Sequence, residues 1–321
     1  MFRGVKLRAL AVKAQCLAAG SKSKATVKRY NYYWQKFVSW CNDKELRALP
    51  APPEVVGLYF AHVADTCRSI STVNAHFYSV KWMHKFCGYD DPTSHSLPIN
   101  IAEGVRRNLI PNKNFKKPAD VKLLVNICSV NFHYLRDSRI AAMCSVGFAG
   151  FFRIGELLKI KRADLVFFDN YFQVKIRNSK TDVYSRGNLV SISKGSTCAC
   201  PRKNLLLYLK QASLLDAPPE KFIFRGLEFR DGRTFLKREN KPLTYKAARK
   251  ELSFYLQKCG YLAEDYAWHS FRHGGATKAA SAGVSDRLFK KHGRWQSERA
   301  KDSYVHESFS DMLSVSKCLG L

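Results

Sequence analysis

The sequence predicts a mainly α-helical protein with a small antiparallel β-sheet, an α+β fold, arranged in two domains. Apolar residues recur at helical spacing through most of the first hundred positions, which indicates an all-α N-terminal domain. Between residues 165 and 192 this spacing changes to alternation, which is typical of short antiparallel strands. A basic, proline-containing stretch over residues 106–120 predicts a linker. We therefore expect a helical domain over residues 1–105 and a mixed domain over residues 121–321.

Apolar stripes and capping residues mark the helices of the N-terminal domain. Tyr30, Trp34, Phe37 and Cys41 recur at helical spacing and form one apolar stripe, which is typical of a helix packed on a core. The stretch Pro50–Pro53 is placed to open the next helix, because proline is favoured in a first helical turn. The expected helices cover residues 5–20, 22–41, a segment from Glu54, a segment from Ser69 or Ser71 to Gly88, and Ile101–Leu109.

The second domain is expected to begin with helices, continue with three strands and end in helices. Near the C-terminus, Gly283 is placed to end a helix, and Ser285 and Ser297 are placed to cap the next two. Gly293 is expected to break the helix between those caps. The other expected elements are helices at 118–130 and 137–151, strands at Leu165–Phe168, Tyr171–Ile176 and Leu189–Ile192, and helices at 201–214 and 243–259.

The charge of the chain predicts a polyanionic partner, which we expect to be double-stranded DNA. The 54 Lys and Arg residues exceed the 26 Asp and Glu residues and give a net charge of +28. Basic residues are in excess in both halves, so two basic domains joined by a basic linker suggest a C-shaped clamp on the DNA backbone. A basic surface for solubility or for an acidic membrane is the alternative. The candidate phosphate contacts are Lys22, Lys24, Lys28, Arg106, Arg107, Lys116 and Lys117.

Cysteine usage and hydropathy argue against a metal site and a membrane segment. The ten cysteines have no regular spacing, and the lone Cys198-x-Cys200 pair has no second pair at zinc-site distance. With no signal peptide, we expect reduced thiols in a cytosol or nucleus. The longest uncharged apolar stretch, Ile140–Phe152, is too short to cross a bilayer. We therefore expect no metal, no cofactor and no membrane partner.

Two arginine motifs could form a phosphate site. His269 and Arg272 are separated by three positions, so their side chains leave the same face of a helix. Arginine offers a planar fork of donors that matches phosphate, and histidine can move a proton near neutral pH. Arg153 ends an apolar run and is followed by Glu156 at i+3. This second pair is either an ion pair that caps a core helix or a second phosphate clamp held by the carboxylate.

These residues resemble the tyrosine recombinases, the phage integrase family, over roughly residues 118–321. Arg153 with Glu156 resembles the family's first arginine and its acidic companion, and His269 and Arg272 match its His-x-x-Arg motif. Lys180, between two predicted strands, is similar to the lysine of the family's β-hairpin. Trp295 lies 23 residues after Arg272, where members carry His or Trp, and Tyr304 lies 9 residues later, where the nucleophile is found. The HSFRHGGAT and HGRW segments are most similar to recombinases of phages and eukaryotic tyrosine-recombinase retroelements.

The resemblance implies a site-specific recombinase or integrase of a mobile element. Such an enzyme cuts and rejoins DNA through a covalent 3′-phosphotyrosine, without metal or ATP, and acts in DNA integration and transposition. Tyr304 would be the nucleophile, with its side-chain oxygen attacking phosphorus. Arg153 and Arg272 would bind the non-bridging oxygens and stabilise the transition state. Glu156 would orient the other groups.

The remaining motif residues have supporting roles in the same interpretation. His269 would act as a general base or a hydrogen-bond donor, and Lys180 would be the general acid for the leaving 5′-oxygen. Trp295 has no titratable proton, so we expect packing and an indole N–H hydrogen bond from it. Homo-oligomers, a dimer on one site and a tetramer in the synapse, are implied as well.

Two other functions fit parts of the pattern. A non-catalytic DNA-binding regulator derived from a recombinase would keep the basic charge, but all the expected motif positions are filled, which favours an enzyme. A type IB topoisomerase-like enzyme shares the chemistry, but the separate helical domain favours a recombinase. The predicted compartment is the nucleus if the source is eukaryotic, which the retroelement-like motifs favour, and otherwise the cytoplasm or nucleoid.

Overall fold

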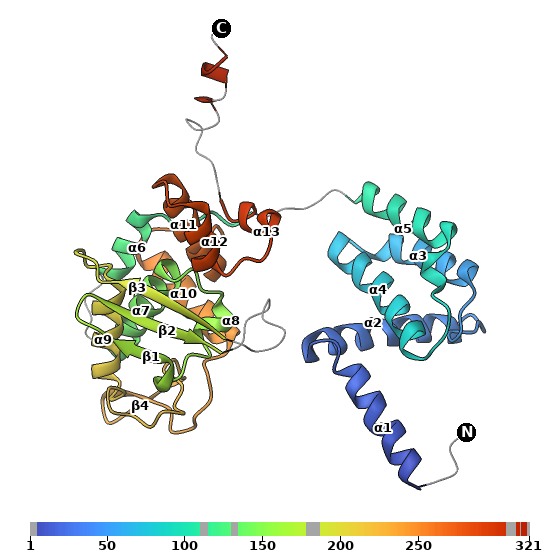
Figure 1. Cartoon of the computed structure of the whole chain (residues 1–321), viewed down its shortest axis with the longest axis horizontal. Helices are drawn as coiled ribbons and strands as arrows, with labels where there is room; N and C mark the ends of the chain where they lie inside the picture. Colours follow the sequence, from blue (N-terminus) through green and yellow to red (C-terminus); the bar gives the residue numbers. More distant parts are fainter. Residues whose placement is uncertain are drawn as a thin grey trace. The chain divides into compact units, whose positions relative to one another are not determined.

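The computed structural model divides into two compact units, Met1–Asn114 and Phe115–Leu321 (Figure 1). The described chain is mostly helical, and its strands form small antiparallel sheets, so the predicted fold class is confirmed. The structure describes residues 5–109, 115–129, 134–177, 187–305, 313–314 and 316–319.

The first unit is all helical, as the apolar periodicity predicts. Ser23 caps the second helix by accepting a hydrogen bond from the Thr26 backbone N–H. The predicted stripe buries Trp34, Phe37 and Cys41 in the core of this unit. The helices are α1 (Val5–Ala19), α2 (Lys24–Asn42), α3 (Pro53–Thr66), α4 (Ile70–Phe86), the short 3-10 helix η1 (Pro92–Ser94) and α5 (Ser96–Asn108).

Two histidines in this unit are buried and neutral. His76 Nδ1 lies 2.7 Å from the Tyr59 hydroxyl, and His84 Nε2 accepts a hydrogen bond of 2.9 Å from the Ala51 backbone N–H. Burial, with the nearby charge of Lys36, lowers the pKa of His76 to about 4. The packing of both rings therefore requires the uncharged form.

We expect the first unit to lose stability in mild acid. The unfolded chain binds a proton at His76 below pH 6.5, whereas the folded chain does so only near pH 4, so the stabilisation is complete above 6.5 and is lost as pH falls. Between pH 7 and pH 5 the opening free energy of α3 and α4, measured by hydrogen exchange, should drop by about 2 kcal/mol.

The matched variants for this prediction are His76→Gln and His95→Gln. His95 is exposed in the same unit, so its replacement should leave the pH dependence unchanged. The His76→Gln protein should show a clearly smaller drop. An equal drop in both variants would contradict the assignment.

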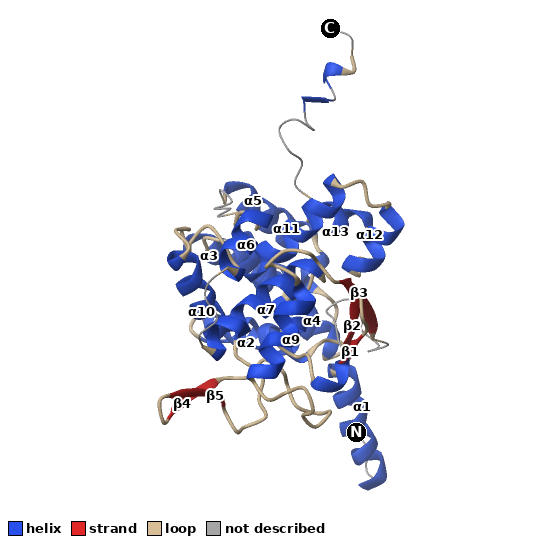
Figure 2. Cartoon of the chain, turned by 90° about the vertical axis from the view of Figure 1, so that its left-hand side faces the viewer, coloured by secondary structure: helices blue, strands red, loops and turns tan. Residues whose placement is uncertain are grey.

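The second unit is built around α7 (Leu135–Ala149), which is buried along nearly its whole length. A three-stranded antiparallel sheet in the order β1-β2-β3 lies along one side of this unit (Figure 2). The remaining elements up to the C-terminal helices are α6 (Val121–Cys128), α8 (Ile154–Leu157), η2 (Arg162–Asp164), β1 (Leu165–Phe167), β2 (Tyr171–Ile176), β3 (Asn188–Ser193), α9 (Pro201–Gln211), β4 (Leu227–Arg230), β5 (Arg233–Leu236) and α10 (Tyr245–Lys258).

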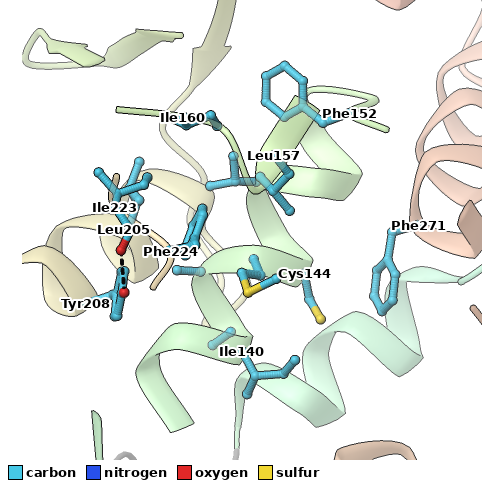
Figure 3. Close-up of a cluster of buried hydrophobic side chains, with 14 of the residues drawn as sticks. Ile140, Cys144, Phe152, Leu157, Ile160, Leu205, Tyr208, Ile223, Phe224 and Phe271 are labelled. Carbon is cyan, nitrogen blue, oxygen red and sulfur yellow. Dashed lines mark hydrogen bonds between the residues drawn. The ribbon is translucent and has the colours of Figure 1, made fainter. Parts of the chain in front are cut away.

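The core of this unit packs α7 against elements that precede it and elements that follow it in the sequence, from Ala119 to Phe271. Figure 3 shows Ile140 and Cys144 of α7 in one apolar cluster with Phe224 and Leu157. The Tyr208 hydroxyl, buried at the edge of this cluster, donates a 2.6 Å hydrogen bond to the Ile223 carbonyl. This packing holds the C-terminal end of α7 and the turn that follows it.

The β4–β5 hairpin was not predicted. It is a separate two-stranded sheet, and in both views it lies at the end of the unit opposite α11 and α12 (Figures 1 and 2). The signal was present, because Asp231 and Gly232 join the strands with φ values of 49° and 72°, and an Asp-Gly pair is typical of a two-residue hairpin turn.

Candidate active site

The C-terminal helices bring the predicted site residues together. They are α11 (Trp268–Ser281), α12 (Asp286–Gly293) and α13 (Glu298–Asp302). Gly283, at φ 72°, follows α11, and the Ser297 hydroxyl accepts from the Ala300 N–H to open α13. Ser285 occupies the predicted N-cap position of α12, but its side chain makes no capping hydrogen bond.

Two glycines let α11 pack directly against its neighbours. A side chain at Gly274 would collide with the Ala119 carbonyl, and one at Gly275 would collide with the Phe148 carbonyl at the end of α7. The absence of a Cβ therefore allows α11 to approach the turn after α7. This approach places Arg272 beside that turn.

Arg272 is fully buried at the centre of the site. Its Nη1 donates to the Phe151 carbonyl, and its Nη2 donates to the Gly293 carbonyl at 2.8 Å. The guanidinium carbon lies 4.9 Å from the ring centre of Trp295 and 4.7 Å from that of Tyr304. Burial and neighbouring positive charges lower its pKa to about 10, so it is still a cation at neutral pH.

Arg153 and Glu156 form the ion pair that the sequence allowed. Arg153 Nη1 lies 2.8 Å from Glu156 Oε1, and the Arg153 backbone N–H donates to Oε2 at 3.0 Å. The carboxylate therefore opens α8, while the Arg153 side chain stays 20% exposed. Burial tends to raise the pKa of Glu156, but Arg294 and Arg153 outweigh it and the pKa is lowered.

Arg294 is a site residue that the sequence motifs missed. It is buried, and its four terminal N–H groups donate to the carbonyls of Gly150, Phe151 and His292 and to Glu156 Oε2, at 2.9–3.1 Å. Its pKa is lowered by burial, which the charge of Glu156 partly offsets. The only signal in the sequence was an arginine between a helix-ending glycine and the motif tryptophan.

The helix break at the HGRW segment is one residue later than expected. Gly293 is the last residue of α12, and Arg294 adopts the left-handed conformation, with φ 57° and ψ 37°. Glycine usually occupies this capping position, and another residue there costs about 1 kcal/mol. Gly293 is needed for a different reason, because a Cβ at that position would collide with the Trp295 ring.

Arg153, Arg272, Arg294 and Glu156 form one buried group, which we name the arginine cluster. Three cations and one anion give it a net charge of 3 − 1 = +2. Like charges so close together raise the energy of the cluster unless an anion approaches. The cluster is therefore suited to a phosphate group.

Aromatic rings cover one side of the arginine cluster. The Tyr304 ring centre lies 5.2 Å from that of His269, 4.6 Å from that of His273 and 5.3 Å from that of Trp295. His269 is an exposed residue, yet crowding by neighbouring side chains and the charges of Arg272 and Arg153 lower its pKa. Its ring is therefore neutral near pH 7 and can accept a proton.

Three donors at this site are buried without an acceptor in the described parts of the chain. They are Nε of Arg272, Nε of Arg294 and the indole Nε1 of Trp295. The expected indole hydrogen bond is thus not made to any described residue. Buried donors are nearly always paired, so the donors of Arg272 and Trp295, whose side chains lie beside the Tyr304 ring, are available for an incoming ligand.

Lys180 lies outside the described residues, in the segment between β2 and β3. His273 was not among the candidates, although it follows His269 by four positions and shares its helix face. The structure thus brings together Tyr304, Trp295, His269 and the arginine cluster.

The seven basic residues expected to contact DNA have different environments. Lys22, Lys24 and Lys28 are exposed. Arg106 and Arg107 pair with Glu103, at 3.2 and 3.6 Å. Lys116 donates to the Glu264 carbonyl, and Lys117 pairs with Asp265 at 2.7 Å. The two arginines and the last two lysines therefore already pair with protein oxygens, and DNA phosphates would have to share these cations.

The described residues hold no group of three or more His, Cys, Asp or Glu side chains that could bind a metal ion. No helix in the described part of the chain is long and apolar enough to span a membrane.

Comparison with known proteins identifies the family. Residues 115–311 match the phage integrase family. The chain belongs to the phage integrase family. It is 26% identical over 303 residues, 93% of this chain and 86% of the relative, to an integrase/recombinase XerD homolog of Selenomonas ruminantium. This confirms the predicted recombinase class, while the bacterial relative gives no support to a nuclear location.

Solved structures of recombinases share the fold of this phage integrase family member. XerH recombinase bound to palindromic difH, in a post-cleavage complex, aligns with a TM-score of 0.62 at 13% identity, over 92% of this chain and 78% of that one. The Tn1549 transposon integrase with transposon right end DNA aligns with a TM-score of 0.57 at 13% identity, over 96% and 98%.

The packing of Trp295 on Gly293 gives a testable consequence. We expect Gly293→Ala to lower the free energy of unfolding by about 2 kcal/mol, because the new methyl group must displace the indole. Gly155→Ala, in α8 next to the same cluster, is the control, since a Cβ there meets nothing within 4 Å. Urea unfolding of both variants measures the effect. Equal stability of the two would contradict the described packing.

Proposed function

We propose that this protein is a site-specific DNA recombinase that cuts and rejoins DNA through a covalent bond between Tyr304 and a 3′-phosphate. The observation that carries the proposal is the position of the Tyr304 ring, 4.7 Å from the Arg272 guanidinium, in a cluster with a charge surplus of +2. A phosphodiester carries one negative charge, and its five-coordinate transition state carries two. The cluster therefore favours the transition state over the ground state.

The proposed step forms one bond and breaks one. The Tyr304 oxygen attacks phosphorus, and the bond from phosphorus to the 5′-oxygen of the next nucleotide breaks. The tyrosine proton passes to His269, whose lowered pKa leaves it neutral and able to accept. Lys180 gives a proton to the leaving oxygen. The 5′-hydroxyl of a second strand reverses the step without ATP, because a phosphodiester has been exchanged for a phosphotyrosyl ester.

Two of the buried donors, those beside the Tyr304 ring, support a phosphate at this position. Arg272 Nε and Trp295 Nε1 have no acceptor among the described residues, and a non-bridging oxygen would supply one. Arg153, which is partly exposed, would contact the same phosphate. Arg272 has no exposed surface under the Tyr304 and Trp295 rings, so DNA entry requires the Tyr304 ring to move off the guanidinium.

Double-stranded DNA is the proposed substrate. The net charge of +28 and the exposed Lys22, Lys24 and Lys28 suit a backbone contact from the first unit as well as the second. The recombinases with this fold were solved on DNA, which supports the same partner here. The proposal also includes the predicted domain boundaries, a dimer on one site and a tetramer in the synapse. The compartment would be one that contains DNA, a nucleoid in a bacterial host.

A covalent adduct tests the nucleophile directly. We expect the protein to become linked to nicked duplexes taken from the flanks of its coding element, and a denaturing gel detects the linked band. Tyr304→Phe should form no adduct while binding DNA normally, because only the hydroxyl is lost.

Other outcomes on the same gel separate the alternatives. Tight binding with no adduct on any flank would favour a DNA-binding regulator. Relaxation of any plasmid, without a specific site, would favour a topoisomerase. An adduct that survives Tyr304→Phe would show that another residue is the nucleophile.

Removal of a cluster arginine should slow cleavage far more than it weakens binding. We expect Arg272→Ala to reduce the rate of adduct formation by roughly 10³-fold, because it removes charge stabilisation from the transition state. The dissociation constant for DNA should change by less than about threefold. Arg287→Ala, an exposed arginine on α12, is the matched control and should cleave normally. Wild-type cleavage by Arg272→Ala would contradict the site.

A further inference from the structure

We propose that Arg294 is a positioning residue for the cleavage step, which holds Glu156 and the Phe151 carbonyl so that Arg153 and Arg272 keep their places. The inference rests on the proposed function of the arginine cluster. It assigns a role to a residue of the HGRW segment to which the family resemblance gave none.

The Phe151 carbonyl links Arg294 to Arg272. It accepts from Arg272 Nη1 and from Arg294 Nη2, the latter at 2.9 Å. A carbonyl oxygen has two lone pairs, so both are occupied by guanidinium donors. Phe151 is itself held at φ 48°, a left-handed conformation. Arg294 thus steadies a strained turn whose carbonyl orients Arg272.

The Glu156 carboxylate links Arg294 to Arg153. Oε2 accepts from Arg294 Nη2 at 3.0 Å and from the Arg153 backbone N–H at 3.0 Å. Oε1 accepts from Arg153 Nη1 at 2.8 Å. With Arg294 in place, the carboxylate has one orientation, and Arg153 is held from both its backbone and its side chain.

Arg294 acts through these residues and does not reach the substrate itself. It is only 6% exposed, and its four terminal N–H groups all donate to protein oxygens. Its Nε has no acceptor among the described residues, but it is buried too. Its left-handed backbone, at φ 57°, would suit glycine better. The strain is tolerated because the side chain makes contacts that glycine cannot make.

Loss of Arg294 should also change how Glu156 titrates. The charged groups that face this carboxylate are Arg153 on α8, Arg272 on α11 and Arg294 after α12, and His292 lies beside Arg294. Without Arg294, burial has more weight and the pKa of Glu156 rises. The carboxylate would then take up a proton as pH falls, at a pH where it is ionised in the wild-type protein.

The test is Arg294→Gly in the full chain, since glycine fits the backbone and removes only the side chain. We expect adduct formation on nicked duplex to slow by about 100-fold, a typical effect of displaced catalytic groups. DNA affinity should change by less than about threefold. The rate should also fall further as pH decreases, because protonation of Glu156 adds a second acid limb to the one that protonation of His269 gives the wild-type protein.

Further variants separate positioning from general damage. Ser213→Gly, at φ 53° in the same unit, is the control for glycine at a left-handed position and should cleave normally. Arg294→Lys keeps the charge but not the fork, and should recover only part of the rate. In a Glu156→Gln background, Arg294→Gly should have a much smaller effect and no additional acid limb, because the two residues act as one unit.

Wild-type cleavage by Arg294→Gly, or an equal loss in both backgrounds, would overturn the inference. A readout independent of cleavage is the ionisation of Glu156, followed by carbon-13 NMR of the labelled carboxyl group. Its pKa should rise in Arg294→Gly, and an unchanged value would also overturn the inference. If the wild-type protein forms no adduct, the proposed function fails, while the NMR titration still decides whether Arg294 holds Glu156.

Discussion

The site depends on a single buried carboxylate, Glu156, placed among three guanidinium groups. Removing each of these ions from water costs several kcal/mol, and one anion cannot neutralise three cations. Backbone carbonyls from the turn after α7 and from the end of α12 accept other terminal N–H groups of Arg272 and Arg294. The side chains of the cluster are therefore held in place, yet the cluster keeps an excess of positive charge. A phosphoryl-transfer site without a metal requires this property.

The surrounding fold serves to keep that unfavourable arrangement in place. Phe151 and Arg294 both adopt left-handed backbone conformations within the site, and such strain persists only where the neighbouring structure is firm. The buried core of α7 fixes one side. On the other side of the site, α11 and Trp295 pack closely because the points of closest approach are glycines. These are Gly274, Gly275 and Gly293.

Motifs that depend on local spacing could be predicted from the sequence, and contacts between distant segments could not. Arg153 with Glu156 and His269 with Arg272 are pairs on single helical turns, and the caps at Gly283 and Ser297 follow from residue type. His273 and the Asp231-Gly232 turn carried readable signals that were overlooked. Arg294 is different: its role depends on a left-handed backbone and on partners 138 to 144 residues earlier, which no local pattern reveals.

The central claim is that the arginine cluster stabilises charge on the phosphoryl group and does not protonate the leaving oxygen. A duplex with sulfur in place of the leaving 5′-oxygen tests this, because a thiolate, with a thiol pKa of about 8.5, leaves without a proton. Adduct formation should then be restored in Lys180→Ala but not in Arg272→Ala. Restoration of Arg272→Ala to the same degree would contradict the account.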